Sequence, residues 1–384
     1  MSAMILLTGA TGLLGRYLLR DLSARGASMA VLVRGDRRRS AEARVDEILS
    51  DWEAATGRSM PRPYLLDGDL TAPGLGLDGD AIRWLARHCR AVLHNGASLT
   101  FQGADRAGDP WRTNLGGTAN VLEVCRAAGI AELHHVSTAY VCGRREDLVH
   151  EDDPPCQAAF RNDYEASKAE SEGLVRAAAA DFPGGVTIYR PAVIVGDSTT
   201  GYTSTYHGLY RYLQFVALMS RYAPRDAEGR IHLPIRLNLT GEERRNLVPV
   251  DWVSAAITAI VMRPEHHRKT YHLAPERPVT AGELEEAMAA HFGYRGVTFV
   301  GPDRLHVADR NEFEAQFYEF VAQYELYWAS EPRFDAANTH AAIPELPCPA
   351  VDAAMVGRLI HFADRDAWGR GRRRRPVAGA AAAS

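Results

Sequence analysis

The sequence predicts an α/β protein with a doubly wound parallel sheet, and three observations support this prediction. Short apolar runs alternate with longer amphipathic stretches through the first half of the chain, which is typical of parallel strands with helices on both faces. The runs are almost continuously apolar, as strands buried on both faces require. A glycine-rich segment, TGATGLLG at 8–15, separates the first run from the first helical stretch. We therefore expect ligands at the carboxyl ends of the strands.

Six apolar runs in the first half are the predicted strands of this sheet. Helical patterns lie between them, such as GLLGRYLLRDLSARG after the first run and TNLGGTANVLEVCRAAG after the fourth. This alternation builds successive βαβ units. The six runs are residues 3–7, 28–33, 63–69, 91–96, 132–137 and 186–191.

The second half of the chain changes character. Residues 197–247 are rich in Gly, Tyr, Arg and Pro and show little periodicity, whereas 247–262 returns to a strand followed by a helix, and 270–275 resembles one more strand. From residue 311 onward, aromatic residues recur at spacings of 4, 3, 4 and 3, which predicts one stripe on a helix, best explained by core packing. The stripe consists of Phe313, Phe317, Phe320, Tyr324 and Tyr327.

These patterns divide the chain into five predicted segments. Residues 1–196 would bind a cofactor and carry the chemistry, 197–247 would be a substrate-binding excursion, and 248–275 would return to the first domain. Residues 276–368 would form a smaller, mostly helical C-terminal substrate-binding domain. The last segment, 369–384, contains RGRRRRP and ends in VAGAAAAS, a composition that predicts a disordered tail.

Composition and charge narrow the possible functions. The 384 residues are 46% hydrophobic and 24% charged, as in ordinary soluble proteins, and the net charge of -4 argues against nucleic acid as a partner. The five cysteines form no CxxC pair, which fits a reducing cytoplasm. No apolar run is long enough to span a membrane, and the apolar N-terminus lacks the basic region of a signal peptide. We expect a cytoplasmic monomer or homodimer.

The glycine-rich segment predicts a dinucleotide site. Glycines between a strand and a helix allow a tight turn and let the backbone approach a pyrophosphate, whose charge the helix N-terminus stabilises. The fourth strand, which ends in HNGAS at 94–98, should lie near the same pyrophosphate, and the residues after the third strand should contact the adenine. The predicted contacts are Gly9, Thr11, Gly12, Leu13, Leu14, Gly15, Asp69, Leu70, Asn95, Gly96 and Ala97.

The end of the second strand favours NADPH over NADH. A site for NADH usually has an acidic residue there, but this chain has Arg34, followed by Arg37, Arg38 and Arg39. Arginine suits bidentate recognition of a phosphate. Asp36 competes for the acidic role, although it comes late and stands among four arginines. We assign Arg34 and Arg38 to the 2′-phosphate.

Three polar side chains should meet at the crevice. Tyr164 and Lys168 stand four residues apart in the helical pattern 162–175, so they share one helix face. A nearby ammonium favours an ionised phenol, and we expect the pKa of Tyr164 to lie well below the usual ~10. The fifth strand ends in HHVSTAYVCG, which brings Ser137 and Thr138 to the same place. Thr138, Tyr164 and Lys168 thus form a donor set aimed at a substrate oxygen.

Together these segments resemble the extended short-chain dehydrogenase/reductases. TGATGLLG, GDL, NGAS, NLGGT, VSTAYV, YEASK and YRPAVIVGDS occur in the family's order between residues 4 and 200, and NLVPVDWVSAAI extends the match toward 260. VSTAYV, YEASKAESEGLV, RPAVIVGDSTTG and NLVPVDWV are most similar to the thioester-reductase and fatty-acyl-reductase branch.

The resemblance implies a Rossmann-type fold and a role for single residues. Thr138 and Tyr164 would be the catalytic hydroxyls, Lys168 would also hold the nicotinamide ribose, and Asn114 would be the family's structural asparagine. The backbone beside the nicotinamide would be that of Pro191, Ala192 and Val193. The implied reaction is NADPH-dependent reduction of an acyl thioester, on CoA or a carrier protein, to an aldehyde, or of a related ketone or aldehyde.

The segment 197–247 leaves and rejoins the sheet beside the nicotinamide crevice, so we expect it to contact the substrate. Its aromatic side chains would wall a pocket for an apolar chain, and Arg236, Arg244 and Arg245 would meet the phosphate of CoA or phosphopantetheine. The predicted substrate contacts are Ser98, Thr138, Tyr202, Tyr206 and Arg244.

Two other functions stay open at this point: a sugar-nucleotide epimerase or dehydratase that recycles its cofactor, and a non-catalytic dinucleotide-binding regulator. The pairs His134–His135 and His266–His267 invite a metal hypothesis. Adjacent residues on a strand point to opposite faces, and no carboxylate cluster lies near them in the sequence, so we predict no metal site.

Overall fold

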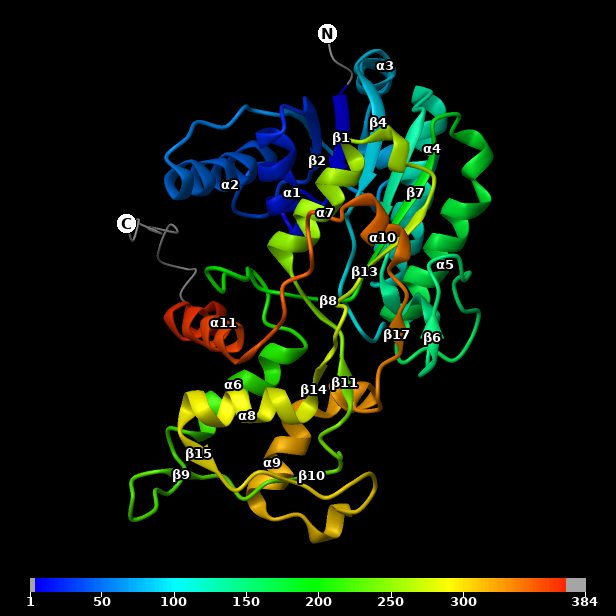
Figure 1. Cartoon of the computed structure of the whole chain (residues 1–384). Coiled ribbons are helices and arrows are strands. Elements are labelled where there is room, and N and C mark those ends of the chain that lie inside the picture. Colours follow the sequence, from blue (N-terminus) through cyan, green and yellow to red (C-terminus); the bar gives the residue numbers. More distant parts are fainter. Residues whose placement is uncertain (1–3, 371–384) are drawn as a thin grey trace.

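The computed structural model describes residues 4–370, and its centre is one sheet of seven parallel strands. Their order is β13-β7-β5-β4-β1-β2-β3 (Figure 1). The strands are β1 (Met4–Thr8), β2 (Met29–Val33), β3 (Tyr64–Asp67), β4 (Cys89–His94), β5 (Glu132–Val136), β7 (Gly185–Pro191) and β13 (Thr270–Leu273). The predicted doubly wound, Rossmann-type fold is confirmed. The predicted tail lies outside the described residues from 371 onward.

Helices cover both faces of the sheet. Successive strand residues point to opposite faces, so Leu7 and Val31 belong to one core while Leu6 and Leu32 belong to the other. The order of the strands reverses between β1 and β4, which is where a doubly wound sheet binds its ligand. The first core is covered by α1 (Leu13–Ala24), α2 (Ala41–Thr56) and α7 (Val250–Val261), and the second by α3 (Gly79–His88), α4 (Gly117–Ala128) and α5 (Asp163–Ala177).

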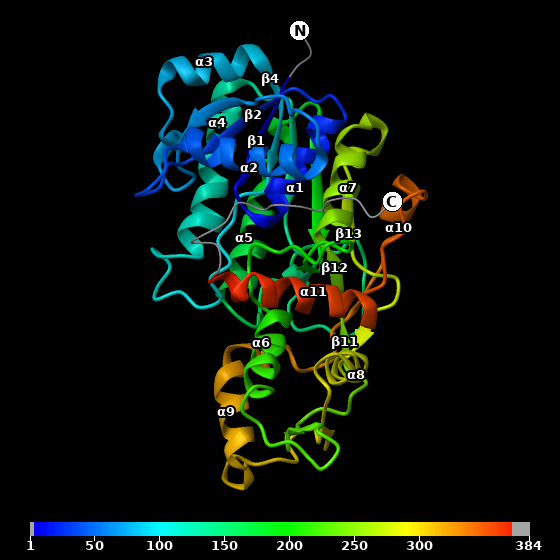
Figure 2. The same cartoon turned by 90° about the vertical axis from the view of Figure 1, so that its left-hand side faces the viewer.

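A smaller lobe stands beyond the carboxyl ends of the strands (Figures 1 and 2). It has a core of its own, in which Phe215 and Leu233 pack against Phe317 and Val321. The lobe therefore combines residues from two predicted segments, 197–247 and 276–368. It contains the helices α6 (Leu209–Met219), α8 (Ala281–Phe292) and α9 (Glu312–Val321).

Short strand pairs connect the two halves of this lobe. The pairs are β9 (Ile231–His232) with β15 (Tyr294–Arg295), β10 (Arg236–Leu237) with β16 (Thr298–Phe299), and β11 (Arg244–Arg245) with β14 (Val279–Thr280). The chain then returns to the sheet through β12 (Leu247–Pro249), which pairs with β8 (Val193–Val195).

The end of the chain leaves the lobe again, unlike the single segment 276–368 that we predicted. β17 (Arg333–Phe334) pairs with β6 (Leu148–Val149), and α10 (Ala337–Ala342) packs beside β13. The helix α11 (Ala353–Arg365) then packs against α8. Within residues 4–370, no helix is both long enough and apolar enough to cross a membrane.

The aromatic stripe does not lie on one α-helix. α9 ends at Val321, and a 3₁₀ helix covers Ala322–Tyr327. A 3₁₀ helix has three residues per turn, so Tyr324 and Tyr327 share one side of it. This change of pitch separates them from the helix that carries Phe313 and Phe320.

Candidate active site

The glycines of the first loop allow a close approach of two backbones. Gly9 has a φ of +70°, and a Cβ there would lie 2.6 Å from the Gly96 Cα. A Cβ on Gly15 would collide with the Gly9 carbonyl oxygen. Gly12 caps α1 with no side-chain hydrogen bond to the first turn. The amide groups of this turn are available for an anion.

A cavity of about 700 Å³ extends from this loop into the lobe. Most of the predicted cofactor contacts line it, whereas Gly15, Arg38 and Asn114 do not. Asn114 instead donates to the Ser98 carbonyl and, over 2.9 Å, to the Ser167 hydroxyl. The contacts that do line the cavity are Gly9, Thr11, Gly12, Leu13, Leu14, Arg34, Asp69, Leu70, Asn95, Gly96, Ala97, Pro191, Ala192 and Val193.

The basic end of the cavity has a residue that the sequence analysis missed. Arg44 lines the cavity and donates over 3.0 Å to the Thr11 hydroxyl. Arg34 lines it as well and forms a 2.7 Å ion pair with Asp69. Arg44 stands in the first turns of α2, where one arginine in AEARVDE looks like part of a solvated helix face. Only the packing of α2 beside the glycine loop reveals it.

Asp36, the competing acidic residue, has its own partners. It accepts hydrogen bonds from the backbone amides of Arg38 and Arg39 and from the Arg39 guanidinium. These bonds hold the pKa of Asp36 below its ordinary value. Arg38 thus contributes its backbone to a turn. The cations at this end of the cavity are Arg34 and Arg44, and they fit a phosphate.

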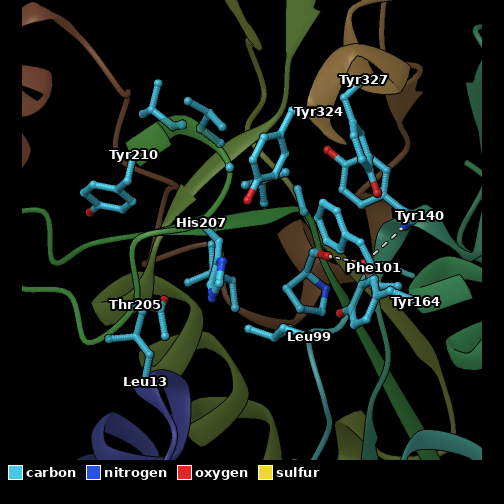
Figure 3. Close-up of a pocket in the computed structure, with 18 of the residues that line it drawn as sticks. Leu13, Leu99, Phe101, Tyr140, Tyr164, Thr205, His207, Tyr210, Tyr324 and Tyr327 are labelled. Carbon is cyan, nitrogen blue, oxygen red and sulfur yellow. Dashed lines mark hydrogen bonds between the residues drawn. The ribbon is translucent and has the colours of Figure 1, made fainter. Parts of the chain in front are cut away.

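Thr138, Tyr164 and Lys168 all line the same cavity, as does Pro191. Figure 3 shows Tyr164 in this cavity. Thr138 follows β5, where its hydroxyl accepts from the Tyr140 amide over 3.3 Å and contacts the Pro191 carbonyl over 3.4 Å. Tyr164 and Lys168 share one face of α5, whose start is capped by Asn162. The structure therefore places these three side chains at one cavity.

The expected low pKa of Tyr164 was wrong. Burial, with a further contribution from the nearby Glu165 carboxylate, raises the pKa of Tyr164 to about 12. The Lys168 ammonium donates over 2.8 Å to the Val136 carbonyl, and burial lowers the pKa of Lys168 to about 8. Tyr164 is thus protonated at neutral pH, the form that a general acid needs.

Beyond Tyr164 the cavity passes an aromatic belt. Phe101 packs against Tyr324 and Tyr327, with ring centroids 5.5 and 5.7 Å apart. Figure 3 shows these rings beside Tyr140 and Tyr164. Part of the aromatic stripe therefore lines the cavity as well as packing the core, and the belt consists of Phe101, Tyr140, Tyr212, Tyr324, Tyr327 and Trp328.

The part of the cavity inside the lobe is mainly apolar, with Glu285 as a polar exception. Side chains from α6, α8, α9 and the short strand pairs face one another across it. We call this part the apolar arm and define it by Val216, Ile235, Leu237, Leu239, Leu284, Met288, Val297, Phe299 and Phe317.

Four of the five predicted substrate residues do not line the cavity. Tyr202 accepts a 2.9 Å hydrogen bond from Arg16, and Tyr206 donates to Asp366 over 2.6 Å. The Ser98 hydroxyl bonds to Thr100, and Arg244 donates to the Glu331 carbonyl over 3.0 Å. Three of these residues belong to the segment 197–247, whose sequence has no regular period. The sequence alone therefore could not show which side chains of this segment point into the cavity.

Of the three arginines proposed for a phosphate, Arg245 lines the cavity. Its guanidinium donates to the carbonyls of Arg244, Ala329 and Trp328. Arg236 is instead ion-paired with Glu314 over 2.7 Å. Neighbouring residues of a strand point to opposite sides, which explains why Arg245 reaches the cavity and Arg244 does not.

One carboxylate lies beside the histidine pairs, although the sequence offered no carboxylate cluster there. Glu132, His134 and His267 converge at the start of β5, with His267 Nδ1 3.8 Å from a Glu132 oxygen. The other Glu132 oxygen accepts from Arg90 over 2.8 Å. None of the three lines the cavity, so they play no part in the site described here.

Comparison with known proteins agrees with this geometry. The family described as male sterility protein matches residues 7–257. An aldehyde reductase, lnaA, of Aspergillus flavus is 25% identical over 93% of this chain and 36% of its own length. A nonribosomal peptide synthetase of the same organism, asaC, is 27% identical over 76% of this chain and 28% of its own. The chain thus spans about a third of these curated relatives.

Solved structures share the fold. The terminal R domain from the myxalamid PKS-NRPS biosynthetic pathway is 28% identical, covers 95% of this chain and 91% of its own, and has a TM-score of 0.77. A UDP-glucose 4-epimerase from Bifidobacterium longum is 16% identical, with coverage of 96% and 100% and a TM-score of 0.65. The second likeness shows the fold alone.

Proposed function

Since the chain belongs to the male sterility protein family, in the thioester-reductase-like branch of the extended short-chain dehydrogenase/reductases, we propose that it uses NADPH to reduce an acyl thioester carried on CoA or on a carrier protein. Membership in this family makes the chain an NAD(P)H-dependent oxidoreductase. The choice of NADPH and of a thioester substrate is our proposal, and it rests on the residues of this chain.

One observation carries the proposal. A single cavity joins the glycine loop, the three predicted donors and the apolar arm. An acyl thioester fits this cavity. Its polar carbonyl would meet the hydroxyls of Thr138 and Tyr164, while its acyl chain would enter the apolar arm. A nucleotide sugar would place many hydroxyls against apolar walls, where unpaired polar groups are costly. This contrast favours a reductase over an epimerase.

Support for NADPH comes from the basic end of the cavity. Arg34 and Arg44 line it, and Asp36 is held by Arg39 and by two backbone amides. The acidic group that would bind a free ribose hydroxyl is thus already engaged by hydrogen bonds within its own turn. Arg34 would have to share or release its ion pair with Asp69 to hold a 2′-phosphate. That pair is exposed on the arginine side, so its loss costs little.

In the proposed reaction, Tyr164 gives its proton to the substrate carbonyl oxygen. The residues of the glycine loop would hold NADPH, which would supply a hydride for the carbonyl carbon. The charge that develops on the oxygen would be stabilised by hydrogen bonds from Thr138 and Tyr164. The Lys168 ammonium would favour the tyrosinate that proton transfer leaves behind. The resulting hemithioacetal then expels its thiol and becomes an aldehyde.

The test is NADPH consumption by the purified chain over a panel of substrates. The panel contains a long-chain acyl-CoA, the same acyl group on a carrier protein, a free aldehyde and a UDP-hexose. We expect oxidation of NADPH with release of free thiol from the two thioesters. Tightly retained NAD⁺ with conversion of the UDP-hexose would establish the epimerase instead. NADPH binding without turnover of any substrate would favour the non-catalytic regulator.

A further inference from the structure

A buried group of charges lies directly behind Lys168. Glu172 is fully buried one turn further along α5, so Tyr164, Lys168 and Glu172 follow one another at intervals of four residues on the same helix face. Ser137 and Arg190 meet the Glu172 carboxylate from β5 and β7 and are buried as well. No step of the reaction above uses Glu172, although a buried carboxylate is costly unless its partners stabilise it.

Each oxygen of Glu172 is held by two hydrogen bonds. One accepts from the Ser137 hydroxyl over 2.6 Å and from Arg190 Nε over 3.2 Å. The other accepts from Arg176 Nε over 2.8 Å and from Arg190 Nη2 over 2.7 Å. Charge-assisted bonds of this number fix the position of the carboxylate. They also hold its pKa below the ordinary value, so it stays charged at neutral pH.

These contacts join the three elements that build the proposed site. Ser137 directly precedes Thr138 at the end of β5, and Arg190 directly precedes Pro191 at the end of β7. Glu172 itself lies on the helix of Tyr164 and Lys168. One carboxylate therefore sets the spacing between the catalytic hydroxyls, the predicted nicotinamide wall and the ammonium.

The Glu172 carboxylate also stabilises the charged form of Lys168. The other titratable groups around Lys168 are His94 on β4, His135 on β5 and Tyr164, and burial keeps the pKa of each histidine low, so both rings are neutral. Burial lowers the pKa of Lys168 to about 8, and in the described chain the Glu172 carboxylate opposes that shift. Arg190 and Arg176 both donate to the Glu172 carboxylate. Without Glu172 the ammonium would lose the group that opposes its desolvation.

The composition of the chain points to the same residue. Only two of its 44 lysine and arginine residues are lysines, Lys168 and the exposed Lys269. Arginine cannot release its proton in proteins, whereas a buried lysine readily shifts its pKa. Lysine at 168 therefore supplies a buried cation whose pKa its surroundings can shift, which an arginine there would not do.

We propose that Glu172 is a positioning residue of this site, which ties the ends of β5 and β7 to α5 and keeps the Lys168 ammonium charged. The consequence for catalysis rests on the proposed function, but the effect on Lys168 does not. Two lysines give two signals in the NMR spectrum of protein made with isotope-labelled lysine, and Lys269→Arg assigns them. The titration of Lys168 is then measured directly, without cofactor or substrate.

Glu172→Gln should lower the measured pKa of Lys168 by about 1 and leave that of Lys269 unchanged. NADPH affinity, followed by fluorescence, should begin to fall at a correspondingly lower pH, as should kcat. The matched control is Glu314→Gln, which removes a buried carboxylate that also has two bonds to one arginine, far from Lys168. It should leave the titration of Lys168 as in the wild type.

Two further variants complete the test. If Glu172→Gln does not fold, combining it with Arg176→Gln also removes the more exposed of the two arginines and should still lower the pKa of Lys168, although by less, because a nearby cation is lost as well. Ser137→Ala keeps the carboxylate but breaks its bond to β5, and should lower kcat several-fold with an unchanged KM.

An unchanged Lys168 pKa without the carboxylate overturns the electrostatic role. An unchanged kcat in Ser137→Ala overturns the positioning role. A shifted pKa in a protein that reduces no thioester would instead refute the proposed function and leave this role of Glu172 standing.

Discussion

Tyr164 differs from phenylalanine by one hydroxyl, and that hydroxyl carries the proton of the proposed reaction. Tyr164→Phe should lower kcat by more than about 100-fold, the usual contribution of a general acid. NADPH affinity should change less than twofold, because the ring still fills the same space beside Phe101. Lys168→Ala is the comparison, since it should weaken both turnover and NADPH binding. Turnover of Tyr164→Phe above a few per cent of wild type would identify another acid.

Arg44 gives the sharpest test of cofactor preference at the residue scale. Loss of one charge-assisted contact to the 2′-phosphate should weaken NADPH binding by roughly 1.5–3 kcal/mol, or about 10- to 150-fold, with little change for NADH. Arg38→Ala is the matched control, because Arg38 belongs to the same basic stretch but does not line the cavity. Titration of each variant with both cofactors measures this. Equal losses of NADPH and NADH in Arg44→Ala would contradict the assignment.

At the scale of the element, β11 presents two neighbouring arginines with different surroundings. Arg245→Ala should raise KM for a CoA- or carrier-bound thioester by roughly tenfold through loss of a phosphate contact, and leave kcat for a free aldehyde unchanged. Arg244→Ala should change neither constant, because Arg244 does not line the cavity and its guanidinium is held by the backbone carbonyls of Glu331 and Glu146. Steady-state kinetics with both substrates decides this. A similar rise in KM for the aldehyde would assign Arg245 a structural role.

The start of α9 carries a pH-sensitive contribution to stability. Glu314 closes a capping box with Asn311 and pairs with Arg236, and these bonds lower the pKa of Glu314 to about 2. A folded pKa below the unfolded ~4.3 stabilises the protein above that value, and the stabilisation disappears as the pH falls toward 2. Glu314→Gln should therefore cost roughly 1–3 kcal/mol near neutral pH. Urea unfolding should show a smaller difference from wild type near pH 3 than near pH 7, and a constant difference would contradict this.

Across the whole molecule, local sequence patterns predicted the features that are set within one helix or strand. Alternating apolar runs gave the order of strands and helices, and the spacing of Tyr164 and Lys168 gave their shared helix face. Contacts between distant segments had no such signal. Arg44 reaches Thr11 only because α2 packs beside α1. Glu132 on β5 contacts His267, which lies in a loop more than a hundred residues further along the chain. The irregular stretch 197–247 has no period, so Tyr202 and Tyr206 could not be told from Tyr210 and Tyr212, which line the cavity.

The cavity spans both halves of the molecule. The lobe should therefore select the length of the substrate's acyl chain, while the reaction takes place beside the sheet. Leu237 on β10 lines the apolar arm and pairs in register with Phe299 of β16, and Leu237→Trp should fill the space that a long acyl chain needs. Each methylene kept in water forfeits about 0.8 kcal/mol, so exclusion of two should lower kcat/KM for a long-chain thioester about tenfold or more. A short-chain thioester should be reduced as before. Leu326→Trp places the same bulk on the exposed surface of the lobe, where Leu326 is 46% exposed, and should leave the ratio of the two substrates unchanged. If Leu237→Trp slowed both substrates equally, the acyl chain would have to lie elsewhere than in the apolar arm.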